Sequence, residues 1–201
     1  MKTASPSKQS AQPALTEIRW HGRGGQGAVT AAKMVAEVAL GQQKFFQAFP
    51  EYGPERSGAP IVAFTRISDA PIQIFSGVEH PQIVAVLDPS LLTIVDVTKG
   101  APDDAIVLIN SDLPPADLRG KAHMQGRRLY TVAATKIAVE TIGRAIPNTP
   151  MVGALVRIAG LFPLESVVEF MRAEFGKKFP PKVVEGNVAA LTRAYEEVQG
   201  E

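Results

Sequence analysis

The sequence predicts an α/β fold with a doubly wound, mainly parallel sheet, a hairpin and a helical C-terminal extension. Short apolar runs typical of strands buried on both faces recur at residues 18–22, 82–88, 105–111 and 129–135. Helical patterns follow the first and the last of these runs, and from Pro150 onward the pattern is helical throughout. Strands that alternate with helices in this way indicate a layered sheet with helices packed against it.

The first part of the chain is expected to form a strand, a helix, a second strand and a loop. Residues 18–22 are an apolar run that stops at glycine, and residues 26–40 carry apolar or small side chains on a helical stripe. Gly41 stands where a helix C-cap is expected. Residues 45–49 are apolar and aromatic enough for a second strand. Residues 50–60 hold three prolines and two glycines, which predicts a loop.

The later elements are predicted from shorter signals. Residues 61–67 and 71–75 are separated by a Ser-Asp turn, and their spacing predicts a hairpin. The strand that ends on Asp88 is followed by Pro89, which favours a short helix or turn. Helices are expected at 136–143, 150–160, 163–175 and 181–198.

Composition limits the classes of function. A formal net charge of +1 provides no global field for nucleic acid or a membrane, and no run approaches the ~20 apolar residues of a membrane span. The chain has no cysteine, which excludes disulfides, zinc–thiolate sites and iron–sulfur ligation by its own residues. Residues 1–15 lack the apolar stretch of a signal peptide. We expect a flexible tail there, a single domain over 16–201, and a cytoplasmic protein.

A glycine-rich loop follows the first predicted strand and matches the spacing G-x-G-x-x-G through Gly22, Arg23, Gly24, Gly25, Gln26 and Gly27. Glycine permits positive φ and close approach of the backbone. The start of a helix offers free amides and partial positive charge, which suits a phosphate, carboxylate or diphosphate. The Arg23 side chain is suited to a charge-assisted contact with such an anion.

A dinucleotide site needs one more feature, an acid at the end of the second strand that binds the ribose hydroxyls. That strand ends in Phe46-Gln47-Ala48-Phe49, and Glu51 comes only after a proline, where it is poorly placed. Three interpretations stay open at this point: a dinucleotide site, recognition of another anion or backbone, and glycines that only permit close packing. The pattern favours the second.

A second cluster of polar side chains lies on the predicted loop after the second strand, with Tyr52, Glu55 and Arg56 among its prolines and glycines. Such a loop is stiff enough to form a contact surface, and Arg56 is suited to bind an anion. In a doubly wound sheet this loop shares an edge with the glycine loop. The alternative is a solvated turn with incidental charges.

The start of the helix at 150–160 is a third distinctive stretch. Asn148 or Thr149 is expected to cap it, with Pro150 at its first position. Gly153 and Ala154 give it a small-residue face, which favours close packing over catalysis.

Catalytic and metal-binding signals are weak. The three histidines, His21, His80 and His123, have no metal-ligand spacing. Asp88 and Asp96 lie near strand ends without an evident partner, and the sequence assigns them no chemistry. No self-sufficient active site is predicted.

The motifs together resemble a known family. WHGRGGQGAVT, then FPEYGPERSGAP followed by AFTRISD, then NTPMVGA, are similar to the gamma subunits of 2-oxoacid:ferredoxin oxidoreductases, most of all to those of the pyruvate type, or pyruvate synthase. The resemblance runs from about residue 17 to the C-terminus. It implies a hetero-oligomeric complex that converts a 2-oxoacid to acyl-coenzyme A and CO2, with electrons passed to ferredoxin.

The resemblance also implies where the cofactors lie. Thiamine diphosphate with Mg²⁺ is expected in the alpha and beta subunits and 4Fe–4S clusters in the beta and delta subunits, so this chain is not expected to act alone. Its glycine loop, residues 22–27, and the loop carrying Tyr52, Gly53, Glu55, Arg56 and Gly58 are expected at subunit interfaces close to coenzyme A. Ser57-Gly58 departs from many relatives, which have a bulkier residue or a second glycine there.

The resemblance leaves three alternatives. One is an aromatic 2-oxoacid oxidoreductase, of the phenylglyoxylate type, with NAD as final acceptor through a flavoprotein subunit. A second is a purely structural subunit, and a third is a free-standing nucleotide-binding oxidoreductase.

Overall fold

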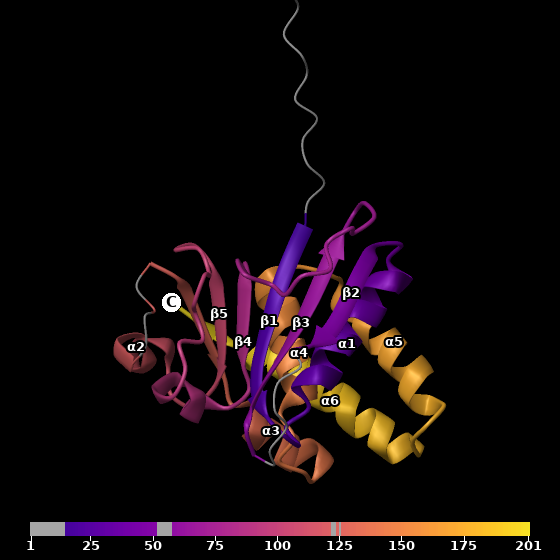
Figure 1. The fold of residues 1–201 in the computed structure, drawn as a ribbon. Coiled ribbons are helices and arrows are strands. Elements are labelled where there is room, and N and C mark those ends of the chain that lie inside the picture. Colours follow the sequence, from indigo (N-terminus) through magenta and orange to yellow (C-terminus); the bar gives the residue numbers. More distant parts are fainter. Residues whose placement is uncertain (1–14, 52–57, 122–123, 125) are drawn as a thin grey trace, which may run out of the picture.

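The computed structural model describes residues 15–51, 58–121, 124 and 126–201. Within them one seven-stranded sheet has the order β2-β3-β1-β4-β5-β6-β7 (Figure 1). The strands are β1 (Leu15–Arg23), β2 (Phe45–Pro50), β3 (Pro60–Ser68), β4 (Ile83–Val86), β5 (Ile106–Asn110), β6 (Arg128–Val132) and β7 (Gln199–Gly200). The α-helices are α1 (Ala28–Gly41), α2 (Pro115–Leu118), α3 (Ala134–Ile142), α4 (Asn148–Ala159), α5 (Leu164–Gly176) and α6 (Pro181–Glu197), and the 3₁₀ helices are η1 (Pro89–Thr93) and η2 (Arg119–Lys121).

The predicted α/β architecture is confirmed, with a sheet that is parallel at its centre. β1, β4, β5 and β6 pair in parallel, whereas β7 is antiparallel to β6. β3 lies between β1 and β2 and is antiparallel to both. β2 therefore runs parallel to β1, so the carboxyl ends of these two strands point to the same edge of the sheet.

The predicted hairpin of 61–67 with 71–75 is wrong. β3 instead pairs with β2, and residues 71–75 form no strand. The physical reason is that β1 and β2 occupy both edges of β3, which leaves no edge free for a further strand.

Two predicted helix ends are also wrong. Gly41 lies inside α1, and the residue with positive φ beyond it is Gln43, at 58°. α4 begins at Asn148 with Pro147 at its N-cap position, so neither Asn148 nor Thr149 caps it, and the Thr149 hydroxyl donates to Asn187 Oδ1 at 2.9 Å.

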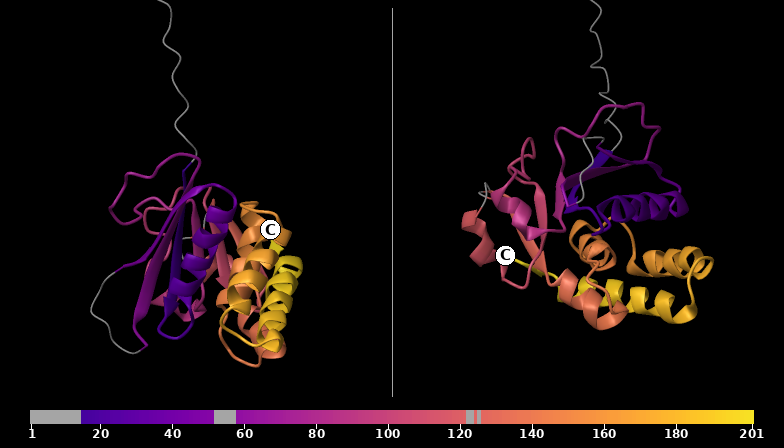
Figure 2. Two further views of the ribbon diagram at one scale, coloured as in Figure 1. Left: turned by 90° about the vertical axis from the view of Figure 1, so that its right-hand side faces the viewer. Right: turned by 60° about the horizontal axis from the view of Figure 1, so that its bottom comes forward.

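Two hydrophobic layers enclose the sheet. The helices α1, α3, α4, α5 and α6 cover one face (Figure 2), and Trp20 on that face donates through Nε1 to Thr65 Oγ1 at 3.1 Å. The opposite faces of β4 and β5 pack under η1 and the segment that follows it, through Val86, Leu91 and Val97 among others. Alternate side chains of each central strand thus enter different cores.

The small-residue face of α4 packs against α6, as the sequence predicts. A Cβ built at Gly153 would overlap the carbonyl oxygen of Leu191 in α6. Gly153 is buried and Leu191 belongs to the main core, where the backbone cannot shift without disturbing many contacts.

Gly153→Ala should therefore lower the free energy of unfolding by about 1–3 kcal/mol, the usual cost of overpacking. Chemical denaturation of the isolated chain measures this loss. Gly176→Ala is the matched control, since a Cβ at this glycine near the end of α5 meets nothing within 4 Å. Equal stability of the two variants would contradict the packing argument.

His21 on β1 is a buried histidine on the face away from α1. The residue is 6 % exposed, its ring donates a hydrogen bond to the backbone carbonyl of Val97, and Nε2 has no hydrogen-bond partner among the described residues. Burial, helped by the positive charge of Arg19, lowers the pKa of His21 to about 4, although Val97 and Asp96 oppose the shift. The histidine is therefore neutral at pH 7.

A depressed pKa makes stability depend on pH in one direction. The unfolded chain takes up a proton near pH 6.5, whereas the folded chain does so only near pH 4. Stability contributed by His21 is thus lost as pH falls from 6.5 to 4, by on the order of 3 kcal/mol. His21→Gln should flatten this part of the unfolding profile, while His80→Gln, at an exposed histidine, should leave it unchanged. Identical profiles for the wild type and His21→Gln would contradict the prediction.

Candidate functional site

The glycine loop lies at the carboxyl edge of the sheet, between the end of β1 and the start of α1. Gly25 and Gly27 have φ of 89° and 81°, a backbone conformation that favours glycine. Gly27 is the N-cap of α1, and no side chain caps this helix. The amides of the first turn are therefore left open toward the edge, where a helix N-terminus attracts negative charge.

The glycines of the loop divide into packed and open positions. A Cβ at Gly22 would lie 3.2 Å from Ala28 Cβ, and one at Gly27 would lie 2.8 Å from Asn148 Nδ2. These two glycines therefore permit close packing inside the chain. Among the described residues, a Cβ at Gly25 would meet nothing within 4 Å, and one at Gly24 would come no closer than 3.8 Å to another atom. The backbone of Gly24 and Gly25 is the part of the loop that is open to a ligand or a partner.

Asn148 lies against Gly27, so two motifs that are 121 residues apart in the sequence meet here. Asn148 is the first residue of α4, so the N-termini of α1 and α4 meet at this point. The third stretch of the sequence therefore belongs to the same edge as the glycine loop. Sequence reasoning favoured packing over catalysis for this stretch and did not connect it with the glycine loop.

Arg23 is held by groups of its own chain. Its Nε lies 3.1 Å from Asp88 Oδ2, Nη1 donates to the Gly58 carbonyl at 2.8 Å, and Nη2 donates to Ser90 Oγ at 3.0 Å. Each of the three guanidinium nitrogens thereby makes one contact within the chain. Arg23 connects the glycine loop to the end of β4 and to the segment that leads into β3.

Gln26 and Asp88 complete this network. Gln26 Oε1 accepts from the Arg23 amide at 2.8 Å, and Gln26 Nε2 donates to Asp88 Oδ2 at 2.9 Å. Burial alone would raise the pKa of Asp88, but hydrogen bonds from Ser90 and Gln26 and the charge of Arg23 outweigh it and hold that pKa below its usual value. The carboxylate therefore stays ionised and fixes the shape of the loop.

Asp88 is the site residue that sequence reasoning missed. The available signal was its place at the end of a predicted parallel strand, because such ends meet at one edge of the sheet. Asp96, considered with it, lies elsewhere: its Oδ1 accepts from the amide and the hydroxyl of Thr98 at 3.0 and 2.9 Å.

Only part of the second predicted cluster can be placed. Tyr52, Glu55 and Arg56 lie outside the described residues, as does Gly53. The two ends of their loop are described: the Glu51 amide donates to the Val62 carbonyl at 2.9 Å, and the Gly58 carbonyl accepts from Arg23. The ends of the second loop thus lie at the same sheet edge as the glycine loop, as the sequence predicts.

The described residues contain no candidate metal site and no candidate membrane-spanning helix. Among them no group of three or more His, Cys, Asp or Glu side chains is placed to hold a metal ion. None of the helices in this part of the chain is long and apolar enough to cross a bilayer.

Comparison with known proteins assigns the family. Residues 17–197 match the family model for pyruvate ferredoxin/flavodoxin oxidoreductase. Pyruvate synthase subunit PorC of Thermotoga maritima is 49 % identical over 91 % of this chain and 94 % of the relative. The common gamma subunit of pyruvate/ketoisovalerate oxidoreductases from Pyrococcus abyssi is 44 % identical over 92 % of this chain and 98 % of its own length.

Solved structures agree with this assignment. The crystal structure of the Thermotoga maritima subunit has a TM-score of 0.83 and 44 % identity, over 93 % of this chain and 98 % of that one. The 2-oxoglutarate:ferredoxin oxidoreductase of Magnetococcus marinus shares the fold, with a TM-score of 0.73, 17 % identity and coverage of 90 % of this chain and 30 % of that one. From its matched residues and its relatives, this chain belongs to the pyruvate ferredoxin/flavodoxin oxidoreductase family, as a gamma-type subunit.

Proposed function

We propose that this chain serves a complex that oxidatively decarboxylates pyruvate to acyl-coenzyme A and CO2 and passes the electrons to ferredoxin. Family membership and the likeness to a pyruvate synthase subunit support this assignment. The Pyrococcus abyssi and Pyrococcus furiosus relatives are named as subunits common to pyruvate and ketoisovalerate oxidoreductases. Those names favour branched 2-oxoacids as a second class of substrate.

In this proposal the redox cofactors belong to partner subunits of the alpha, beta and delta types. Thiamine diphosphate with Mg²⁺ supplies the carbanion chemistry there, and 4Fe–4S clusters carry the electrons. This chain has no cysteine and so offers no thiolate for a cluster. The contribution proposed for this chain is to bind coenzyme A and to position the loop that contacts it.

The observation that carries a binding role is the open backbone of Gly24 and Gly25 beside the uncapped start of α1. Backbone amides at a helix N-terminus suit the phosphate and diphosphate groups of coenzyme A. Because Arg23 contacts Asp88, the Gly58 carbonyl and Ser90 at once, we assign Arg23 mainly the task of positioning the loop. Tyr52, Glu55 and Arg56 are proposed to supply side-chain contacts to the same ligand.

Reconstitution tests the function as a whole. The chain combined with its partner subunits should restore pyruvate- and coenzyme A-dependent reduction of ferredoxin. Neither the chain alone nor the partners without it should do so. Thiamine-dependent oxidation of pyruvate by the isolated chain, or full activity of the partners without it, would overturn the proposal.

Gly25→Ala tests the open backbone of the loop. A methyl group at this position hinders an approaching phosphate and strains a residue with φ of 89°. The KM for coenzyme A in the assembled complex should rise about tenfold, which corresponds to the loss of about 1.4 kcal/mol of binding. Steady-state kinetics with coenzyme A as the varied substrate measure the change.

Gly143→Ala is the matched control for this experiment. Gly143 follows α3, has φ of 74°, and a Cβ there also meets nothing within 4 Å. Both substitutions therefore carry a similar backbone strain, but only Gly25 lies on the loop. Equal effects of the two variants on the KM would contradict the binding role, and loss of assembly by Gly25→Ala without a change in KM would favour a packing role.

Asp88→Asn tests the positioning network. The variant removes the charge that faces Arg23 while keeping the size of the side chain, so the loop should lose part of its order. We expect the KM for coenzyme A to rise about three- to tenfold with a smaller change in kcat, and stability to fall by about 1 kcal/mol. Glu140→Gln, which removes one partner of the exposed Glu140–Arg193 ion pair, is the control and should leave the KM unchanged. A wild-type KM in Asp88→Asn would contradict a role of this network in coenzyme A binding.

A further inference from the structure

A cluster of exposed apolar side chains lies at the end of the sheet opposite the glycine loop. We call it the Phe75 patch. Leu40, Phe45 and Phe46 are exposed and line one groove together with half-buried Ile72. Ile74 and Phe75 are exposed and follow Ile72 in the chain, and Arg66 Nη1 donates both to the Ile74 carbonyl and to Gln47 Oε1, a residue of that groove. Phe75 is 89 % exposed and Leu40 is 62 % exposed. Contact of so much apolar surface with water is unfavourable in free energy. Five of the ten large hydrophobic side chains that are exposed within the described residues belong to this patch. Such a concentration marks an interaction surface rather than scattered exposure.

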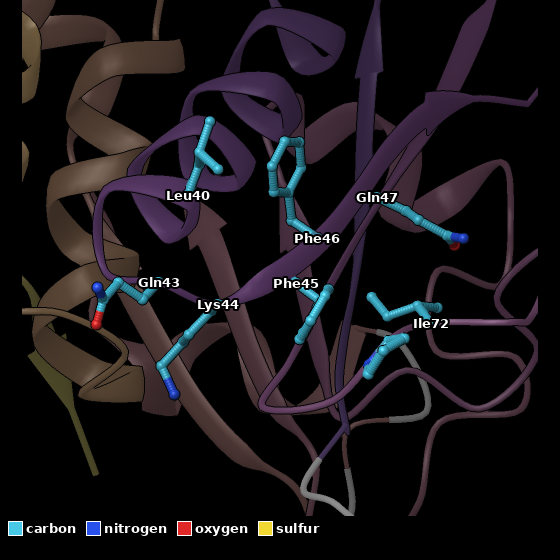
Figure 3. Close-up of a pocket in the computed structure, with 8 residues that line it drawn as sticks. Leu40, Gln43, Lys44, Phe45, Phe46, Gln47 and Ile72 are labelled. Atoms are coloured by element: carbon cyan, nitrogen blue, oxygen red, sulfur yellow. The ribbon is translucent and has the colours of Figure 1, made fainter.

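The patch surrounds the first residues of β2, which is an edge strand. Phe46 lies beside Leu40 at the end of α1, and Phe45 lies beside Ile72 on the other side of the strand (Figure 3). Together with Gln43, Lys44, Gln47 and Pro71 these side chains line a groove of about 450 Å³. Among the described strands β2 pairs only with β3, so the backbone groups on its outer side have no strand partner there.

The segment that carries Phe75 is held in place from within the protein. Arg66, which is 1 % exposed, donates through Nη1 to the Ile74 carbonyl at 3.3 Å and through Nη2 to the Gly77 carbonyl at 3.1 Å. The Arg66 Nε lies 2.7 Å from Glu17 Oε1, which fixes the guanidinium in turn. A buried ion pair thus anchors the backbone on both sides of Phe75. Pre-organisation of this kind lowers the entropic cost of binding a partner.

The position of the patch separates it from the proposed coenzyme A site. Phe45 is in register with Ser68 and Leu15, at the start of β1, whereas the glycine loop follows Arg23 at the other end of β1. Nine residues of strand separate the two ends by roughly 25 Å. The glycine-loop function therefore does not account for these exposed side chains.

We propose that the Phe75 patch is the surface on which another subunit of the oxidoreductase complex docks, through an apolar surface of its own. The relatives of this chain are subunits by name, so part of its surface is buried in the assembly. The N-terminal residues 1–14, which precede Leu15 at the same end of the sheet, are a poor occupant. Their sequence, MKTASPSKQSAQPA, contains one large apolar residue, Met1. The proposal rests on the chain's role as a subunit but not on coenzyme A binding.

Phe75→Ser in the full chain, combined with the partner subunits, tests the proposal. Because Phe75 is almost fully exposed, the variant should keep the wild-type Tm in isolation, while its affinity for the partner subunits falls at least tenfold. Phe45→Ser should act in the same direction. Its matched control is Phe179→Ser, because Phe45 and Phe179 are 45 % and 46 % exposed and Phe179 lies outside the patch. Binding of the purified, identified partner subunits to the immobilised chain measures the affinity.

The outcomes separate the possible occupants. Wild-type affinity of Phe75→Ser for the partner subunits overturns the proposal. A wild-type chain that self-associates in sedimentation, and dissociates when Phe75 is replaced, points to a second copy of the chain instead. Stronger binding of a hydrophobic dye after deletion of residues 1–13 points to the N-terminal segment. When enough Phe75→Ser chain is added to saturate the partner subunits, the KM of the complex for coenzyme A should stay at the wild-type value. A wrong docking proposal can therefore be distinguished from a wrong coenzyme A proposal.

Discussion

The insertion of β3 between β1 and β2 is the constraint on which the rest of the structure depends. An antiparallel strand between them makes β1 and β2 parallel, so both strands end at the edge where the glycine loop lies. The same insertion places β2 at the margin of the sheet, where its outer backbone and Phe45 are exposed. The candidate ligand edge and the candidate docking surface therefore follow from a single choice of strand order.

Two arginines hold the two ends of this arrangement. Arg23 binds Asp88 and the Gly58 carbonyl at the carboxyl edge, and Arg66 binds Glu17 and the Ile74 carbonyl near the opposite end. A partly buried ion pair adds little net stability, since desolvation offsets most of the attraction. The value of these pairs lies in geometry, because a guanidinium presents several donors in a rigid plane and can fix backbone carbonyls of separate segments at once.

Strand order also explains why the glycine motif departs from a dinucleotide site. In the dinucleotide-binding fold the second strand lies next to the first, and an acid at the end of the second strand binds the ribose of the dinucleotide. Here β3 separates the two strands, and β2 ends in Phe49 and Pro50 without an acid. Gly24 and Gly25 are exposed, and it is there that we propose an anion binds, while Arg23 and Gln26 contact Asp88 of their own chain. The motif keeps a backbone geometry that suits a phosphate and lacks the acid that binds the ribose in a nicotinamide or flavin dinucleotide site.

The sequence by itself determined the parallel strands, the helices after Pro150, the glycine loop and the family, because these depend on local periodicity, on turn residues and on motifs that are contiguous in the chain. Tertiary structure alone decided that β3 pairs with β2, that Asp88 holds Arg23, and that Asn148 lies against Gly27. Each of these contacts joins residues brought together by strand order or helix packing. Local sequence patterns do not show which edge of a strand is already paired with another strand. The pairing of those edges determines which residues become neighbours in the folded protein.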